Sequence, residues 1–189
     1  MNLVLIGYRA TGKTTLARHL ADRLGWQWID ADVEIERRAG KSIARIFTEQ
    51  GEAAFRDLEA QVIADLCGGP RLVLAAGGGA PLREESRRAM RESGHVVWLT
   101  AAPETILARM TADATTIDRR PSLTNRPPME EIVQLLDRRE PAYREAAHQM
   151  VDTEGKSPAE LVEEILTGFA DAQQNNPPLP TGDTQRVDR

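Results

Sequence analysis

The chain has 189 residues, and its 41% of hydrophobic residues are enough for the core of one domain. Its net charge of -5 argues against a general nucleic-acid-binding protein, because duplex binding requires an excess of basic side chains. The single cysteine, Cys67, excludes an intramolecular disulfide, and no apolar run approaches the roughly 20 residues of a membrane span, so we expect a soluble cytoplasmic protein.

The first expected elements are a strand, a glycine loop and a helix. Residues 3–6 are continuously apolar and predict a strand. They run straight into the glycine loop without a basic segment, which argues against a signal peptide. Residues 13–24 carry apolar side chains at helical spacing, and Gly25 is placed to end that helix. Residues 27–30 predict a second, short strand.

The middle of the chain predicts helices between two further strands. A polar helical stretch covers residues 33–67 and is interrupted near Gly40 and Gly51. Residues 71–76 predict a third strand, which is apolar enough to be central. A fourth strand is expected over residues 95–99, followed by a helix that begins at Pro103.

The last part predicts two helices around a fifth strand. A helix over residues 129–139 should break or restart at Pro141, because the proline ring blocks the preceding turn. Residues 149–151 predict the fifth strand, and a capping box from Ser157 to Glu160 opens the last helix. This alternation of strands and helices is typical of a parallel α/β sheet.

Two segments differ from the rest in composition. Residues 111–128 are polar with little helical periodicity, and a loop of this length in a compact domain indicates a lid. Residues 172–189 are rich in Gln, Asn, Pro and Thr, and we expect a disordered tail. The sequence therefore predicts one domain over residues 1–171.

Residues 7–14 match the phosphate-binding pattern G-x-x-x-x-G-K-[ST] between a strand and a helix. The glycines let successive N–H groups point at phosphate oxygens, and the helix N-terminus adds positive potential. We expect Lys13 to neutralise phosphate charge and Thr14 to bind Mg²⁺. The alternative is a plain glycine turn, which does not require Gly-Lys-Thr. The expected ATP-binding residues here are Gly7, Arg9, Ala10, Thr11, Gly12, Lys13, Thr14 and Thr15.

A second metal ligand should be a carboxylate at the end of a strand. The candidates are Asp30 and Asp32 after the second strand and Asp152 after the fifth. The Asp-x-Asp pair fits better, because in an extended segment its carboxylates point the same way, about 7 Å apart. One can serve the metal and the other a substrate hydroxyl. The alternative for Asp32 is the N-cap of the next helix, and the two roles are compatible.

The acceptor side has three candidate groups. Arg56 and Glu59 share a helix face, although most such pairs are solvated ion pairs. Gly77-Gly78-Gly79 follows a buried strand, where bare backbone can meet a ligand oxyanion, or can simply form a flexible strand exit. Arg119 and Arg120 lie in the expected lid, from which an arginine can reach a transferring phosphoryl group.

Taken together, residues 1–169 resemble the shikimate kinase family. The matching pieces are the phosphate loop, Asp30-Ala31-Asp32, residues 51–59, Gly77-Gly78-Gly79, Arg120-Pro121 and Arg139-Glu140-Pro141-Ala142-Tyr143. The resemblance implies a three-layer P-loop kinase fold, with a five-stranded parallel sheet flanked by helices and a mobile lid. It also implies transfer of the ATP γ-phosphate to the 3-hydroxyl of shikimate, in aromatic amino-acid biosynthesis.

The resemblance implies roles on the acceptor side. Asp32 resembles the residue that contacts the reacting hydroxyl and acts as a base. Arg56 and Arg139 resemble the pair that grips the shikimate carboxylate, and a bidentate guanidinium suits a carboxylate. Residues 77–79, Gly77, Gly78 and Gly79, would complete this binding site.

The resemblance also implies roles on the nucleotide side. Arg120 resembles the lid arginine that reaches the phosphates and acts in catalysis with Lys13. Arg109 resembles the arginine that stacks on adenine. Asp30 resembles the acid on the metal side, where it would hold Mg²⁺ together with Thr14.

The chain departs from the family pattern in two places, and other functions remain open. Ala10 stands where the family usually has glycine, and the lid is a few residues longer, so Arg119 and Arg120 are alternatives for one role. A kinase of the same fold with gluconate or a nucleoside monophosphate as acceptor is the nearest competitor. A non-catalytic ligand-binding regulator would show an eroded site, which this chain does not. We expect a monomer.

Overall fold

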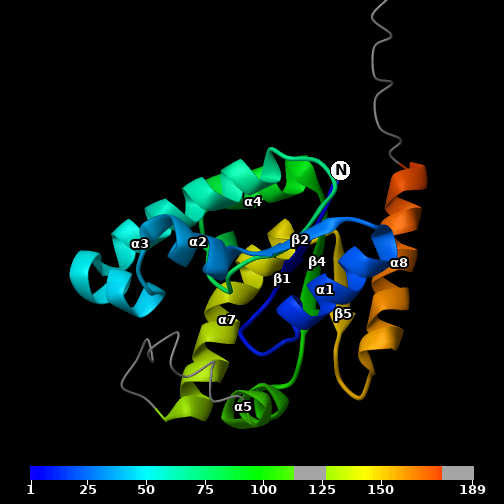
Figure 1. Ribbon diagram of the computed structural model, residues 1–189. Coiled ribbons are helices and arrows are strands. Elements are labelled where there is room, and N and C mark those ends of the chain that lie inside the picture. Colours follow the sequence, from blue (N-terminus) through cyan, green and yellow to red (C-terminus); the bar gives the residue numbers. More distant parts are fainter. Residues whose placement is uncertain (113–126, 176–189) are drawn as a thin grey trace, which may run out of the picture.

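A five-stranded parallel sheet forms the middle layer of the protein in the computed structural model, which describes residues 1–112 and 127–175 (Figure 1). The strands are β1 (Asn2–Ile6), β2 (Gln27–Asp30), β3 (Leu72–Ala75), β4 (Gly94–Thr100) and β5 (Gln149–Asp152). Their order is β2-β3-β1-β4-β5, and each neighbouring pair is parallel. The expected α/β fold is confirmed, and the loops after the strands meet at one edge of the sheet.

Helices cover both faces of the sheet (Figure 1). They are α1 (Lys13–Leu24), α2 (Ala31–Ala39), α3 (Ile43–Cys67), α4 (Glu84–Ser93), α5 (Pro103–Ala112), α7 (Pro128–Ala146) and α8 (Pro158–Asn175), with a 3₁₀ turn η1 (Ala80–Leu82). Leu3 and Leu5 of β1 pack with α1 and α8, whereas Val4 and Ile6 pack with α3, α4 and α7. Side chains alternate along a strand, so β1 is apolar from Leu3 to Ile6 because both of its faces are buried.

The expected helical stretch after β2 consists of two helices. Gly40, with φ 66°, ends α2, and Gly51, with φ 81° and ψ 171°, interrupts α3, so both predicted interruptions are confirmed. We had expected the Asp30–Asp32 segment to be extended. This is wrong, because α2 begins at Ala31. The N-cap is Asp30 and not Asp32: the Oδ1 atom of Asp30 accepts a hydrogen bond from the Asp32 N–H at 3.0 Å.

One expectation about the helices is wrong, and one helix was not expected. Pro141 neither breaks nor restarts α7, which continues through it to Ala146. A proline removes one helical hydrogen bond, but the burial of Tyr143 and Ala146 beyond it keeps the helix on the sheet. The unexpected helix is α4, for which the sequence shows no clear apolar stripe. Its ten residues are mostly charged, and Ser86 and Met90 are the positions that it buries.

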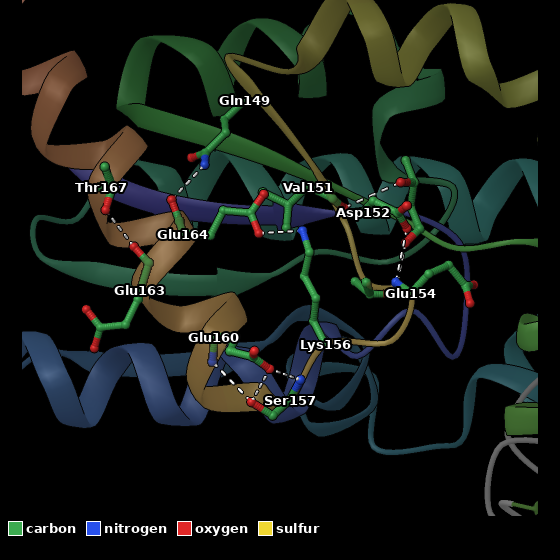
Figure 2. A network of polar contacts seen from close by, with 12 residues as sticks. Gln149, Val151, Asp152, Glu154, Lys156, Ser157, Glu160, Glu163, Glu164 and Thr167 are labelled. Carbon is green, nitrogen blue, oxygen red and sulfur yellow. Dashed lines mark hydrogen bonds and ion pairs between the residues drawn. The ribbon is translucent and has the colours of Figure 1, made fainter.

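The connection from β5 to α8 is built from polar contacts (Figure 2). The predicted capping box is confirmed, since the Ser157 N–H donates to Glu160 and the Glu160 N–H donates to Ser157 Oγ. Lys156 pairs with Glu164 at 2.6 Å, and Gln149 of β5 donates to the Glu164 carbonyl at 3.0 Å. These contacts fix α8 against β5.

The two segments of unusual composition are described only in part. Helix α8 continues to Asn175, so the first residues of the expected tail, 172–189, are helical. Residues 113–126 of the expected lid and 176–189 of the tail lie outside the described residues. Among the helices of the described ranges, none combines the length and apolarity required to cross a membrane.

Candidate active site

The phosphate loop joins β1 to α1 with an unusual backbone. A Cβ at Gly7, which has φ 139°, would lie 2.5 Å from the carbonyl oxygen of Leu99, so this position requires glycine. Gly12, with φ 92°, leads into α1. Ala10 also has a left-handed backbone, with φ 60°, which costs an L-residue about 1–2 kcal/mol. The departure from the family's usual glycine therefore introduces backbone strain into the loop.

Lys13 lies over the phosphate loop. Its Nζ donates to the carbonyl oxygens of Gly7 at 3.0 Å and Tyr8 at 2.6 Å. The hydroxyl of Thr11 donates to the same Tyr8 carbonyl at 2.8 Å. Thr15 lies in the exposed first turn of α1. The loop thus brings an ammonium group and a helix N-terminus together, and both attract phosphate.

Thr14 and Asp30 come together across the carboxyl edge of the sheet. The Thr14 hydroxyl donates to Asp30 Oδ2 at 2.6 Å. Hard oxygen donors suit Mg²⁺, so these two side chains fit that ion. In the described part of the chain, no three His, Cys, Asp or Glu side chains gather as a metal cluster. A Mg²⁺ held here would complete its shell with phosphate oxygens and water, which is how this ion commonly binds.

The other two acid candidates are placed differently. Asp32 lies in the first turn of α2 and, through its N–H, contacts the carboxylate that accepts from Thr14. Asp152 lies at the end of β5, where its Oδ1 accepts from the Glu154 N–H at 3.0 Å in a turn. The structure therefore brings Asp32, and not Asp152, beside the Thr14–Asp30 pair.

The glycine triplet after β3 supports two arginines from different helices. Arg139 of α7 donates from Nη1 to the Gly78 carbonyl at 3.2 Å. A Cβ at Gly79 would lie 2.6 Å from Cζ of Arg56 on α3, so that guanidinium rests against bare backbone. Gly77 accepts a hydrogen bond from the Ala80 N–H at 3.0 Å and starts η1. The triplet is thus a platform for both guanidinium groups, and it does not act merely as a flexible strand exit.

The two arginines differ in how their charge is balanced. Arg56 is 9% exposed and pairs with Glu59, itself 1% exposed, at 2.6 Å, and with Glu52 at 3.3 Å. The alternative of a solvated Arg56–Glu59 pair is therefore wrong. Arg139 is 6% exposed and, within residues 1–112 and 127–175, makes no ion pair with a carboxylate. An unbalanced buried cation is costly, so this corner of the site favours an anionic ligand.

Arg9 lies in the phosphate loop and Arg109 contacts it, and both side chains also contact other protein groups. Arg9 donates from Nη2 to Glu131 Oε1 at 2.7 Å, which ties the phosphate loop to α7. Arg109 of α5 donates to the hydroxyl of Thr153 at 3.0 Å, to its carbonyl at 3.2 Å and to the Ala10 carbonyl at 3.5 Å. Arg109 therefore connects α5, the turn after β5 and the phosphate loop. Arg119 and Arg120 lie outside the described residues.

Four residues at this site were not identified from the sequence. They are Tyr8, Glu131, Tyr143 and Thr153. Tyr143 donates to the Gly78 carbonyl at 2.6 Å from 65 positions away, and Glu131 meets Arg9 from 122 positions away. No local pattern predicts such contacts, because they depend on the order of the strands.

A separate hollow lies at the opposite end of the strands. It has a volume of about 520 Å³ and is lined by residues around Trp26 and Pro70, at the amino-terminal ends of β2 and β3. The phosphate loop, Asp30 and the glycine triplet all follow the carboxyl ends of strands. In open α/β sheets, ligands bind at the carboxyl ends, so we place the active site there and not in this hollow.

Comparisons with known proteins agree on one family. The family model for shikimate kinase matches residues 9–169. A shikimate kinase of Rhodopirellula baltica is 44% identical over 165 residues, which cover 87% of this chain and 88% of that protein. Among solved structures, the shikimate kinase of Acinetobacter baumannii in complex with shikimate superposes with a TM-score of 0.84 at 37% identity, covering 91% of this chain and 94% of the other.

A more distant likeness concerns the fold alone. A gluconokinase from Sinorhizobium meliloti superposes with a TM-score of 0.56 at 16% identity, covering 92% of this chain and 94% of the other. Proteins of one fold host different acceptors, so this likeness does not identify an acceptor for the present chain.

Proposed function

Because the chain belongs to the shikimate kinase family, we propose that it transfers the γ-phosphoryl group of MgATP to the 3-hydroxyl of shikimate, giving shikimate 3-phosphate and ADP. One observation carries the assignment of the acceptor. Arg139 is buried with no carboxylate partner among the described residues, and it lies beside Arg56 on the glycine platform. This corner can bind the carboxylate of a small hydroxy acid with charge-assisted hydrogen bonds.

The donor side binds and neutralises the phosphates. The loop N–H groups and Lys13 would bind the β- and γ-phosphates, and Lys13 would leave the Gly7 and Tyr8 carbonyls to do so. Thr14 and Asp30 would hold Mg²⁺, which supplies charge neutralisation and orients the phosphates. Arg109 would lie against the adenine, and Arg120 is proposed, from the resemblance alone, to reach the phosphoryl group.

The acceptor side positions one hydroxyl. Arg56 and Arg139 would hold the shikimate carboxylate at one end of the molecule, with Gly77, Gly78 and Gly79 forming the floor beneath it. Asp32, next to the Thr14–Asp30 pair, would accept the proton of the hydroxyl that attacks phosphorus. Phosphoryl transfer depends mostly on positioning and charge stabilisation, which this arrangement supplies.

A monomer is proposed as the working unit. Sedimentation equilibrium of the full chain checks this. A cytoplasmic location is proposed with it, because the reaction consumes ATP.

A coupled ADP-release assay tests the function. The full chain is assayed with MgATP against shikimate, quinate, gluconate, AMP and CMP. We expect turnover with shikimate, and its loss when EDTA removes the divalent metal. Activity confined to gluconate or a nucleotide would keep the donor side and refute the roles of Arg56 and Arg139. No activity with any of the five would favour a ligand-binding regulator, which calorimetry with ATP and shikimate would detect.

A further inference from the structure

Tyr8, the second residue of the phosphate loop, contacts groups on both sides of the site. It is 1% exposed, and its carbonyl oxygen accepts from Lys13 Nζ at 2.6 Å and from Thr11 Oγ1 at 2.8 Å. These contacts belong to its backbone, so any residue at this position could make them. These backbone contacts therefore do not explain why the side chain at position 8 is aromatic.

The Tyr8 ring lies close to two guanidinium groups. The Cζ atom of Arg139 is 5.4 Å from the ring centroid, and that of Arg9 is 5.5 Å from it. Guanidinium groups within about 6 Å of an aromatic centroid are attracted to the ring, more strongly where water is excluded. Arg9 has other partners, because it also pairs with Glu131 and donates to the Tyr8 hydroxyl at 3.3 Å.

Arg139 depends more on this ring than Arg9 does. Among the described residues, its contacts are the hydrogen bond from Nη1 to the Gly78 carbonyl and the Tyr8 ring. A single hydrogen bond does not by itself fix the plane of a guanidinium, whereas a contact with a ring adds a restriction on that plane. The plane matters, because the fork of an arginine meets a carboxylate through two parallel hydrogen bonds.

We propose that Tyr8 is a positioning residue, whose ring holds Arg139 in the orientation that binds the acceptor carboxylate. The inference rests on the proposed function and adds to it. The carbonyl oxygen of Tyr8 also accepts from Lys13 Nζ, so one loop residue contacts both the acceptor arginine and the phosphate-binding lysine.

The alternative is a purely structural role. Tyr8 also belongs to an apolar cluster with Ile106, Met110, Ile132 and Leu135. A core role predicts that removing the ring lowers stability and affects both substrates alike. A positioning role predicts a selective effect on the acceptor, because the contact that is lost belongs to Arg139.

Variants at Tyr8 separate the two roles. Tyr8→Phe keeps the ring and removes the hydroxyl, whereas Tyr8→Met and Tyr8→Leu remove the ring and keep an apolar side chain. Cation–π contacts contribute about 1–2 kcal/mol where water is excluded, so the ring-less variants should raise KM for shikimate by about 5- to 30-fold. KM for ATP should stay within threefold of wild type. Tyr8→Phe should keep both constants within twofold, as the conservative variant that rescues the function.

Each other outcome decides against the inference. Equal increases of both KM values, or a fall in kcat alone, would assign Tyr8 a structural role. The same conclusion holds if Tyr8→Phe behaves like Tyr8→Met, or if both ring-less variants fail to give a folded protein by circular dichroism. A wild-type enzyme that does not phosphorylate shikimate would refute the proposed function itself, and the positioning role with it. Failure of the inference alone would leave wild-type turnover intact.

Discussion

Two glycines of the same platform differ in how closely a guanidinium approaches them. At Gly79, the space of a side chain is taken by the Arg56 guanidinium, whereas at Gly78 a Cβ would lie 3.3 Å from the Gly7 carbonyl and 3.4 Å from Arg139 Nη1. A Cβ at Gly79 would overlap with the guanidinium, whereas a Cβ at Gly78 would make tight contacts that a small shift relieves. A methyl group at Gly79 therefore disturbs the platform more than one at Gly78 would.

We expect Gly79→Ala to raise KM for shikimate by roughly tenfold. The new methyl group would displace the Arg56 guanidinium, which is held in place by Glu59 and is too buried to move freely. Losing one charge-assisted hydrogen bond to a ligand costs about 1.5–3 kcal/mol, which corresponds to tenfold or more. Steady-state kinetics measures the change, with Gly69→Ala as the control outside the site, where a Cβ would lie 3.7 Å from the Leu66 carbonyl. Equal KM values for the two variants would contradict the role of Gly79.

Asp32→Asn should lower kcat by about 10²- to 10⁴-fold. The amide keeps the shape of the carboxylate, but it cannot accept the proton of the attacking hydroxyl. ATP affinity should stay within twofold, because the Thr14–Asp30 pair is unchanged. Glu34→Gln is the control on the same helix, since Glu34 pairs with Arg37 and Arg38. If Asp32→Asn turned over as fast as Glu34→Gln, the role of Asp32 as a base would be refuted.

At the scale of elements, the strands and the loop motif were predictable, whereas the contacts between elements were not. β3 and residues 3–6 of β1 are continuously apolar because both of their faces are buried, and the phosphate loop has its own pattern. Helix α4 is mostly charged, so its sequence says little about where it packs. The course of α7 through Pro141 depends on burial of later residues, which no local rule contains.

For the candidate site too, residues in local motifs were predictable and contacts between distant residues were not. Lys13, Thr14 and Asp30 could be selected from motif and strand position, and the structure brings them together at one edge of the sheet. The ring contact between Tyr8 and Arg139 joins residues on two elements far apart in the chain. It becomes visible once the sheet order is known.

A prediction at this scale concerns the interruption of α3. Gly51 has φ 81° and ψ 171°, a conformation open almost only to glycine, and a Cβ there would meet no atom within 4 Å. Gly51→Ala should therefore destabilise the protein by about 1–3 kcal/mol through backbone strain alone. Urea unfolding measures the loss. The exposed neighbour Gln50→Ala should change stability little, and equal stability of the two variants would refute the strain.

At the scale of the whole molecule, two histidines beside the sheet should make the stability of the fold depend on pH. His95 of β4 and His148, just before β5, stack with ring centroids 5.6 Å apart. The Val96 N–H donates to His148 Nδ1 at 3.0 Å, which requires that nitrogen to be unprotonated. Desolvation lowers the pKa of His148 to about 4, with further contributions from Arg91 and His95, and desolvation also lowers the pKa of His95.

Stability should therefore fall as the pH falls from about 6.5 towards 4. Both histidines have a lower pKa in the folded protein than in the unfolded chain, so the unfolded chain binds more protons in this range. His148 is partly exposed, so we expect it to contribute on the order of 1 kcal/mol between pH 7 and 5. Urea unfolding at both pH values measures this. His148→Gln should reduce the change in unfolding free energy between the two pH values, and the exposed His19→Gln should not. An equal change in both variants would contradict the role of His148.

The central place of β1 has a consequence for synthesis on the ribosome. Leu3 pairs with Val73 on one side and with His95 on the other, so β1 is translated before both of its neighbouring strands. At about 5–20 residues per second, roughly 100 residues take about 5–20 s. Throughout that time the apolar segment of β1 lacks at least one of its neighbouring strands, and the phosphate loop that follows it lacks the strand against which it packs. The phosphate loop therefore reaches its final environment, with Gly7 against the Leu99 carbonyl, only after β4 has been translated.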